Sequence, residues 1–334
     1  MMRTWATALL VTLAAAGAAR AQPAQVEVAL TGGASTESIG AIATQLRVFG
    51  EPREHLRFFV EAAWATRSDS QSSSDAFGAA YPYDKRVRVI EAYGEALRQG
   101  ERLLLGLRAG QYRTPFGIYG RSDHAYTGFL RAPLIRYDDY FALSNNFLEA
   151  GANLVAGTPR FHGELSVGAP QDVGTGVRQS GLNQVVRLQA YHGPVILGAS
   201  YIHSRPYDRR SFVRGDLEFT GVDLRLMLSG VQIRGEWING QPFNNATTTG
   251  WYLDAIVHRP ILGPVTLVAR AEHLDYDAGR FSSYDKRTTA GARVQITPAL
   301  VGQVNVMRQP RSAQSPVAHT ELDAALTWVV RYPR

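Results

Sequence analysis

The feature that most constrains this chain is an alternation of apolar and other residues with a period of two, from about residue 25 to the C-terminus. In the range 222–228, the apolar positions are Val222, Leu224, Leu226 and Leu228. The positions between them are Asp223, Arg225 and Met227. Successive side chains of a strand point to opposite faces, so this pattern predicts β-strands. Charges at strand centres opposite a consistently apolar face indicate a membrane barrel, with lipid outside and water inside.

Sixteen segments carry the pattern and are predicted strands. They are 25–33, 38–49, 55–66, 86–97, 102–112, 147–157, 160–168, 183–192, 195–204, 218–228, 231–239, 249–258, 265–275, 286–296, 299–308 and 320–332. Short turns rich in Gly and Pro alternate with longer polar connections, and only the first outer connection, 34–37, breaks the rule. Outer-membrane barrels have short turns on one side and long loops on the other. We therefore predict an all-β fold, a transmembrane antiparallel up-and-down β-barrel of about sixteen strands.

The first residues have the pattern of a secretory signal peptide. Arg3 supplies a positive start, residues 8–16 form a short apolar core, and Ala19 and Ala21 form a small-x-small cleavage site. We predict a signal peptide at 1–21, a transmembrane β-barrel at 22–334, and a location in the bacterial outer membrane. The chain has no cysteine, which excludes a disulfide framework.

The connection 113–146 is the longest between predicted strands. Its aromatic residues are Phe116, Tyr119, Tyr126, Phe129, Tyr137, Tyr140 and Phe141. Sixteen strands enclose a bore too wide for wall side chains alone to fill. We therefore expect this long loop to fold into the lumen and narrow the pore. The alternative is an outer lid or a loop that contacts other copies in a trimer.

Arginines dominate the positive charge, because only Lys85 and Lys286 are lysines among the 35 basic residues. With the apolar face outward, the wall arginines predicted to line the pore near mid-height are Arg108, Arg187, Arg225, Arg234, Arg270 and Arg293. The arginines of the long loop are Arg113, Arg121, Arg131 and Arg136. Rings of basic side chains favour anions in pores. The loop arginines have few acidic sequence neighbours, so we expect them to be the better anion contacts.

The same parity turns eight carboxylates toward the lumen. They are Glu61, Glu149, Glu164, Asp223, Glu236, Asp254, Glu272 and Asp323. Three same-strand pairs lie two residues apart, namely Asp223 with Arg225, Arg234 with Glu236, and Arg270 with Glu272. Opposite charges at such spacing partly neutralise each other. Structural ion pairing within the wall is therefore an open alternative for each wall arginine.

Sequence features that would indicate other functions are weak. A serine hydrolase of the common type carries a Gly-x-Ser-x-Gly turn, which this chain lacks. Its histidines are scattered, and no cluster of His, Asp and Glu has metal-ligand spacing. No run of Lys and Arg indicates nucleic-acid binding. We therefore predict a protein that is not an enzyme and needs no cofactor, metal or nucleic-acid partner.

The stretch Gly110-Gln111-Tyr112-Arg113-Thr114-Pro115-Phe116-Gly117 resembles a motif of the phosphate-selective porin family, the porin O/P type. In that family a similar Gly-x-x-[Lys/Arg]-x-Pro-Phe-Gly stretch leaves a strand in the first third of the barrel. The resemblance implies a sixteen-stranded trimeric outer-membrane channel with anion preference. By position, only Arg113 corresponds to a basic residue of the motif.

These observations predict an outer-membrane porin, a passive diffusion channel for small hydrophilic solutes with a preference for anions such as phosphate or other oxyanions. The expected partners are those solutes, the outer-membrane lipid and, from the resemblance, further copies of the chain in a homotrimer. Two alternatives stay open. One is a structural or surface-interaction barrel with an occluded lumen, and the other is an outer-membrane lipid hydrolase.

Overall fold

The computed structural model describes residues 22–36, 40–66, 86–118, 128–136, 147–172, 181–204, 216–242, 245–258, 261–279, 282–310 and 317–332. The first eight strands are β1 (Gln22–Ser35), β2 (Ala41–Arg53), β3 (Leu56–Ala65), β4 (Arg88–Gln99), β5 (Leu104–Arg113), β6 (Phe147–Gly157), β7 (Phe161–Asp172) and β8 (Asn183–His192). The other eight are β9 (Val195–Ser204), β10 (Leu217–Leu228), β11 (Val231–Gln241), β12 (Thr247–Val257), β13 (Val265–Asp277), β14 (Ser282–Thr297), β15 (Leu300–Gln309) and β16 (His319–Tyr332). The predicted signal peptide lies outside the described residues.

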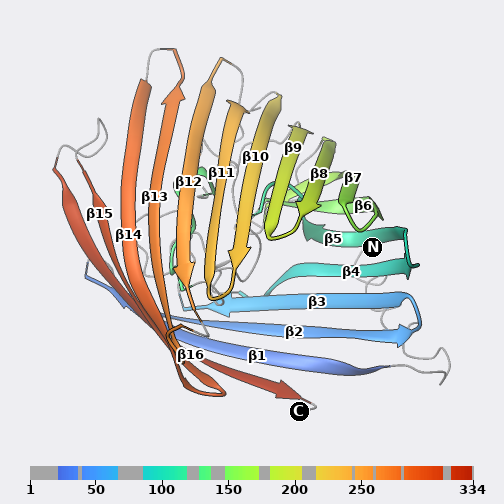
Figure 1. Cartoon of the computed structure of the whole chain (residues 1–334), viewed down its shortest axis with the longest axis horizontal. Coiled ribbons are helices and arrows are strands. Elements are labelled where there is room, and N and C mark those ends of the chain that lie inside the picture. The colour runs from blue at the N-terminus through green and yellow to red at the C-terminus, as the bar shows by residue number, and fades with distance from the viewer. Residues whose placement is uncertain are drawn as a thin grey trace.

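Every strand pairs in antiparallel fashion with its neighbours in sequence, and β16 pairs with β1, so the sheet closes into a barrel (Figure 1). At this seam Leu30 lies opposite Trp328, and Ala34 lies opposite Ala324. Closure leaves no strand edge with unpaired backbone groups, which is the condition for a sheet in hydrocarbon. The predicted fold class and strand number are confirmed, and the predicted strand ends differ from the observed ones by up to four residues.

The two faces of the strands differ as predicted. On the outside, Leu188, Leu197 and Leu253 are 60%, 54% and 49% exposed. On the inside, Arg187 and Asp254 are 4% and 0% exposed, although they lie on the same strands as Leu188 and Leu253. Apolar side chains thus cover the exterior, and the charges point into the barrel. A surface of this kind suits the hydrocarbon of a bilayer.

Short turns join the strands on one side of the barrel. Two residues join β8 to β9, and two join β10 to β11. Gly193 and Gly230 in these turns have φ of 55° and 80°, a region that glycine enters without steric cost. Among the described residues, no helix has the length and apolar character to cross a membrane.

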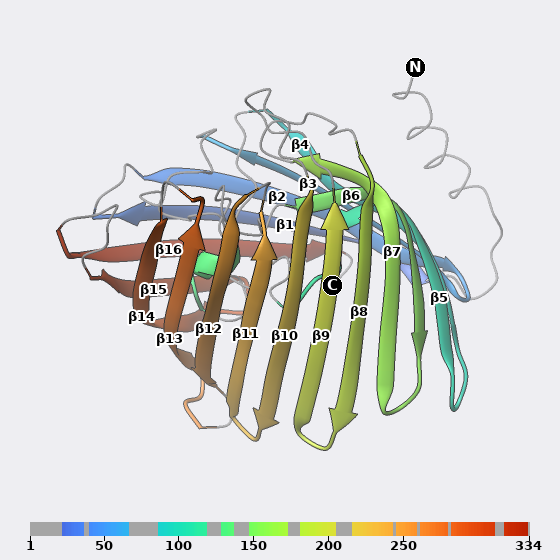
Figure 2. The ribbon, with the colours of Figure 1, turned by 90° about the horizontal axis from the view of Figure 1, so that it is seen from above.

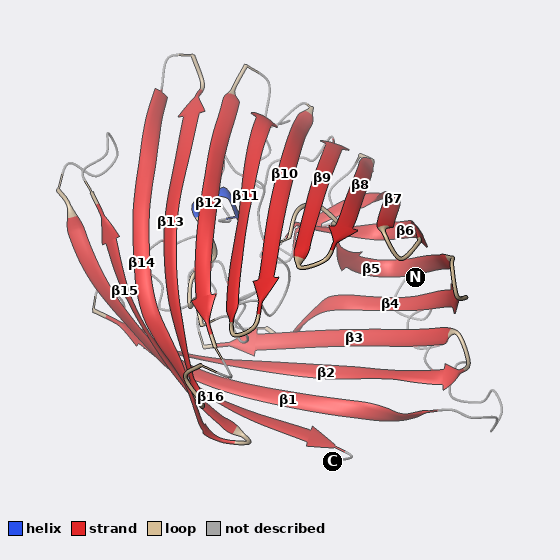
Figure 3. Cartoon of the chain, in the orientation of Figure 1, coloured by secondary structure: helices blue, strands red, loops and turns tan. Residues whose placement is uncertain are grey.

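The described parts of the connection between β5 and β6, residues 114–118 and 128–136, lie inside the barrel. Its short 3-10 helix η2 (Leu134–Arg136) lies against β12 and β13, inside the ring of strands (Figures 2 and 3). Every residue from Phe129 to Arg136 is buried. The prediction that this long loop folds into the lumen is confirmed for its described part.

Candidate functional site: the lumen constriction

The chain leaves β5 and turns into the lumen through the glycine-containing motif that resembles the porin family. Gly110 and Gly117 have φ of 134° and 66°, values that favour glycine. A Cβ on Gly117 would collide with the side chains of Glu236 and Arg136. The backbone N–H of Gly117 donates to Oγ of Ser200 at 3.0 Å. The motif therefore sets this part of the chain directly against the inner wall.

Two wall glycines make room for apolar side chains of the loop. A Cβ on Gly221 would lie 2.9 Å from the ring of Phe116, and one on Gly250 would lie 2.6 Å from Cγ2 of Ile135. Around them the wall supplies an apolar cluster of Val185, Ile202, Leu217, Phe219, Ile238, Tyr252, Leu274 and Tyr276. The lumen thus contains a packed core between loop and wall on the β8 to β13 side.

On the other side of the bore, the loop is held by polar side chains of β15 and β16. The backbone N–H of Leu130 donates to Oδ1 of Asn305 at 2.6 Å. Nε and Nη2 of Arg131 donate to the two carboxylate oxygens of Asp323 at 2.7 and 2.9 Å. Nη2 of Arg131 also donates to Glu321. Such charge-assisted, forked contacts are among the stronger hydrogen bonds in proteins.

Charged residues of β13 and β14 hold the backbone of the loop. Nη2 of Arg287 donates to the carbonyl of Ala132 at 2.5 Å. The N–H of Leu134 donates to Oε2 of Glu272 at 2.6 Å. Arg287 and Glu272 also pair with each other at 2.7 Å. One buried ion pair therefore satisfies both a donor and an acceptor of the loop backbone, which would otherwise be costly to bury.

The end of the described loop is held by Arg136. Its Nη2 donates to Glu236 on β11 and, at 2.7 Å, to the carbonyl of Phe116. Its guanidinium also lies 5.0 Å from the centre of the Phe116 ring. Arg136 therefore joins the two stretches of the loop that enter and cross the lumen.

A ladder of paired charges crosses β11, β12 and β13 beneath the loop. Asp254 accepts hydrogen bonds from Arg234 at 3.0 Å and from Arg270 at 2.6 and 2.9 Å. Nη1 of Arg270 donates to the carbonyl of Arg131 at 2.9 Å, and its guanidinium lies 4.0 Å from the centre of the Phe129 ring. Arg270 therefore contacts both the wall and the loop.

Most of the arginines that the sequence predicts to line the pore are paired with wall carboxylates. Arg131 and Arg136 have few acidic neighbours in sequence, but β16 and β11 supply carboxylate partners for them. Their contact with a passing anion stays a prediction. The remaining described pairs are Arg108 with Glu95 at 2.9 Å, Arg113 with Glu91 at 3.7 Å, and Arg187 with Asp223 at 3.1 Å. Arg121 lies outside the described residues.

Arg225 is different, because it forms no ion pair with a carboxylate of the described residues. It is only half-buried, and it lies directly opposite Arg234 in the β10–β11 register. When the amide of Gln189 is turned to accept, its oxygen lies 2.6 Å from Nη2 of Arg225. Two neighbouring guanidiniums, one without a counter-charge, produce a local excess of positive charge on this part of the wall.

The wall as a whole is not basic. Among the described residues, seven arginines are buried: Arg47, Arg131, Arg136, Arg187, Arg234, Arg270 and Arg287. Eleven carboxylates are buried with them: Glu27, Glu61, Glu91, Glu149, Asp223, Glu236, Asp254, Glu272, Asp285, Glu321 and Asp323. Buried carboxylates therefore outnumber buried arginines among the described residues.

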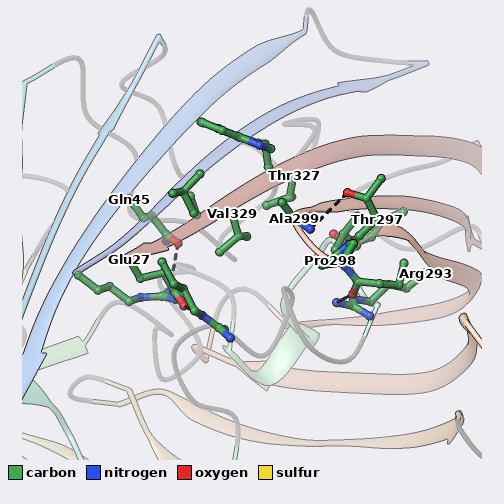
Figure 4. Close-up of a pocket in the computed structure, with 16 residues that line it drawn as sticks. Glu27, Gln45, Arg293, Thr297, Pro298, Ala299, Thr327 and Val329 are labelled. Carbon is green, nitrogen blue, oxygen red and sulfur yellow. Dashed lines mark hydrogen bonds and ion pairs between the residues drawn. The ribbon is translucent and has the colours of Figure 1, made fainter. Parts of the chain in front are cut away.

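A cavity of about 680 Å³ lies inside the short-turn end of the barrel. Figure 4 shows Glu27 and Gln45 on one side of it, and Arg293 and Thr297 on the other. The remaining predicted pore arginine, Arg293, thus lines this cavity, and its Nη2 donates to Gln295 at 3.2 Å. This space continues the lumen below the loop.

Sequence reasoning missed two residues that hold the loop, Asn305 and Glu321. Strand parity places both on the inner face, so the pattern that identified Asp323 could have identified them. Their role depends on the loop lying nearby, which parity does not reveal. No group of described His, Asp and Glu side chains is arranged to hold a metal ion.

Solved structures with a similar architecture include outer-membrane proteins. OmpT of Vibrio cholerae matches with a TM-score of 0.61 and 10% identity, over 94% of this chain and 99% of that chain. A porin matches with a TM-score of 0.53 and 11% identity, over 92% and 99%. A substituted porin of Rh. blastica matches with a TM-score of 0.52 and 13% identity, over 92% and 99%. No family model and no curated protein sequence matches the chain.

At these identities the likeness concerns the fold. The chain is a closed sixteen-stranded β-barrel with the architecture of outer-membrane porins. Its apolar exterior and closed hydrogen-bonded sheet place it in the bacterial outer membrane.

Proposed function

We propose that the protein is a porin, a passive diffusion channel for small hydrophilic solutes. The observation that carries this proposal is the loop 128–136, which is pinned across the bore above a cavity lined by both charged and apolar side chains. A loop that only plugged the barrel would need no open cavity beside it. A wall lined by charged and amide side chains is compatible with water and with dissolved solutes. The proposal includes no catalytic step.

We further propose a modest preference for anions, with phosphate and other oxyanions as candidate solutes. Arg225 supports this, because it has no carboxylate partner among the described residues and lies opposite Arg234. A guanidinium binds oxyanions through a planar fork of donors. The buried carboxylates offset most other arginines, so we expect the preference to be modest.

A homotrimer is the oligomeric state that we propose. The resemblance of the motif 110–117 to phosphate-selective porins supports it, and a trimer form is described for OmpT of Vibrio cholerae. The state can be measured by light scattering of the detergent-solubilised protein. A monodisperse monomer in mild detergent would contradict this part of the proposal.

One observation favours an occluded barrel as the second candidate. The apolar cluster that joins Phe116 and Ile135 to the wall fills part of the bore with side chains that exclude water. Planar-bilayer recording separates the two candidates. Steps of conductance support the channel, and an absence of conductance from folded protein rejects it. Reversal potentials in asymmetric KCl then measure selectivity, and a preference for cations would reject the role given to Arg225.

A further inference from the structure

Two cations face outward on neighbouring strands, near the end of the barrel that carries the long connections. Arg308 of β15 lies opposite Thr288 of β14, on the same face as the exposed Val306. Lys286 lies two residues nearer the start of β14, opposite His273 of β13. Both cations are exposed. They therefore point toward the membrane and not into the lumen.

Neither cation forms an ion pair with a described carboxylate, in contrast to most arginines of the lumen. The Nζ of Lys286 lies 5.5 Å from the centre of the Tyr284 ring. The carboxylate of the nearby Asp275 lies 2.7 Å from Nε2 of His273. Two unneutralised cations on the lipid-facing surface would be unfavourable in hydrocarbon, so an external counter-charge is expected.

The cations lie at the level of the membrane interface. Trp251 is directly opposite His273, and Trp237 is directly opposite Trp251, so the aromatic side chains form a row beside Lys286. Exposed Tyr and Trp residues concentrate where the lipid headgroups begin. Headgroup phosphates are the anions present at this level.

An apolar groove of about 950 Å³ runs over the outer surface below the cations. Its lining residues lie on or beside β14, β15, β16, β1 and β2, which are neighbours around the β1–β16 seam (Figure 1). Small side chains form much of its floor, among them Gly32, Ala292, Gly302 and Ala324. Its member Val304 is four residues from Arg308 on the same strand face, which is about 14 Å at about 3.4 Å per residue. The groove therefore begins within the reach of one lipid molecule from the two cations.

We propose that this surface binds a lipid with an anionic phosphate headgroup. Lys286 and Arg308 hold the phosphate, and an acyl chain lies in the groove, where the small residues allow close approach. A second copy of this chain fits less well. It would bury the two cations without a described carboxylate to neutralise them, and uncompensated buried charge is strongly unfavourable.

The test measures lipid retention by native mass spectrometry. The full-length barrel is released from nanodiscs of mixed phosphatidylcholine and phosphatidylglycerol, and the phosphatidylglycerol that remains bound is compared with phosphatidylcholine. We expect selective retention of phosphatidylglycerol. In the Lys286→Gln/Arg308→Gln variant the selectivity should fall about fivefold for each cation removed. The Lys286→Arg variant, which keeps the charge, should retain it.

Arg98 provides the matched control, because it is exposed and opposite the outward-facing Leu105 at the short-turn end of the barrel. Arg98→Gln should leave the selectivity unchanged. Equal losses in the control and the double variant, or no loss in either, would overturn the proposal. The Ala324→Phe variant, which fills the groove, should weaken retention of long-chain lipid. If it instead changes only the oligomeric state, a second copy occupies the groove and the proposal is wrong.

Discussion

Removing the guanidinium of Arg131 should loosen the lumen loop beside β16 while the barrel remains folded. Arg131 supplies the charged contact between the loop and β16, and it donates to Asp323 and Glu321. The strand pairing of the barrel does not involve this side chain. In Arg131→Ala the closed sheet is therefore intact, and the hydrogen bonds and ion pairs between the loop and β16 are lost.

The free-energy cost of Arg131→Ala follows from the burial of this ion-pair network. The side chain of Arg131 is 3% exposed, and those of Asp323 and Glu321 are 1% exposed. Removing one partner of a buried ion pair costs about 3–5 kcal/mol, because the other charge is left uncompensated. The contacts at Arg287 and Glu272 remain, and a hydrogen bond to a charged group contributes about 1.5–3 kcal/mol. The hydrogen bond from Leu130 to Asn305 and the one from Arg270 to the carbonyl of residue 131 also remain. The loop should therefore loosen beside β16 while η2 stays in place.

Single-channel recording in planar bilayers measures this change. We expect a larger conductance and more open-channel noise in Arg131→Ala than in the parent. Arg57→Ala is the control, because Arg57 is 50% exposed and 3.6 Å from Glu51, and exposed pairs contribute about 0–1 kcal/mol. Substituting Arg131, Asp323 and Glu321 together by neutral residues of similar size should restore part of the lost stability. Identical conductance and noise in parent and Arg131→Ala, with both folded, would refute the argument.

Two further changes test neighbouring parts of the site. Gly117→Ala places a Cβ against Glu236 and Arg136 at a positive φ, which should destabilise the folded loop by about 1–3 kcal/mol. We expect the loop of the folded variant to be cleaved by protease more rapidly than in the parent. Unchanged proteolysis would contradict this prediction. Arg225→Gln removes the arginine without a described carboxylate partner, so the reversal potential in asymmetric KCl should move toward cation preference by more than in Arg108→Gln, whose arginine pairs with Glu95 at 2.9 Å. Equal shifts in these two variants would show that pairing does not decide selectivity.

The sequence alone predicts the barrel well because its pattern is local. A period of two identifies each strand, and the contrast between faces decides which side meets lipid. In β8, this assignment correctly turns Arg187 inward and Leu188 outward. The strand ends are less certain, because a rim residue such as Ser282 is equally compatible with a strand or with a polar loop.

The contacts of the loop could not be predicted, since they join residues far apart in sequence. Arg131 and Asp323 are separated by 192 positions, and nothing in either segment specifies the other. The composition of the loop indicates that it is too apolar to remain in water. It does not reveal that Asn305 accepts from its backbone, or that the missing side chain at Gly250 makes space for Ile135.

The charge pairs show the same limit and lead to a final prediction. The sequence suggests pairs within one strand, but Arg234 and Arg270 both pair with Asp254 across neighbouring strands. Directly opposite residues are about 4.5–5.5 Å apart, which is closer than residues two apart on one strand. The register therefore decides the partners.

Asp254→Asn should then leave the positive charges of Arg234 and Arg270 without their carboxylate partner. The reversal potential should therefore change in the direction of greater anion preference. Glu61→Gln is the matched control, because Glu61 is equally buried but pairs with Arg47, which keeps Glu27 as a second carboxylate partner at 2.7 Å. Its effect on selectivity should be smaller, since Arg47 remains neutralised. A larger shift in Glu61→Gln than in Asp254→Asn, with both barrels folded, would mean that the cross-strand pairs of β11 to β13 do not control the charge seen by the solute.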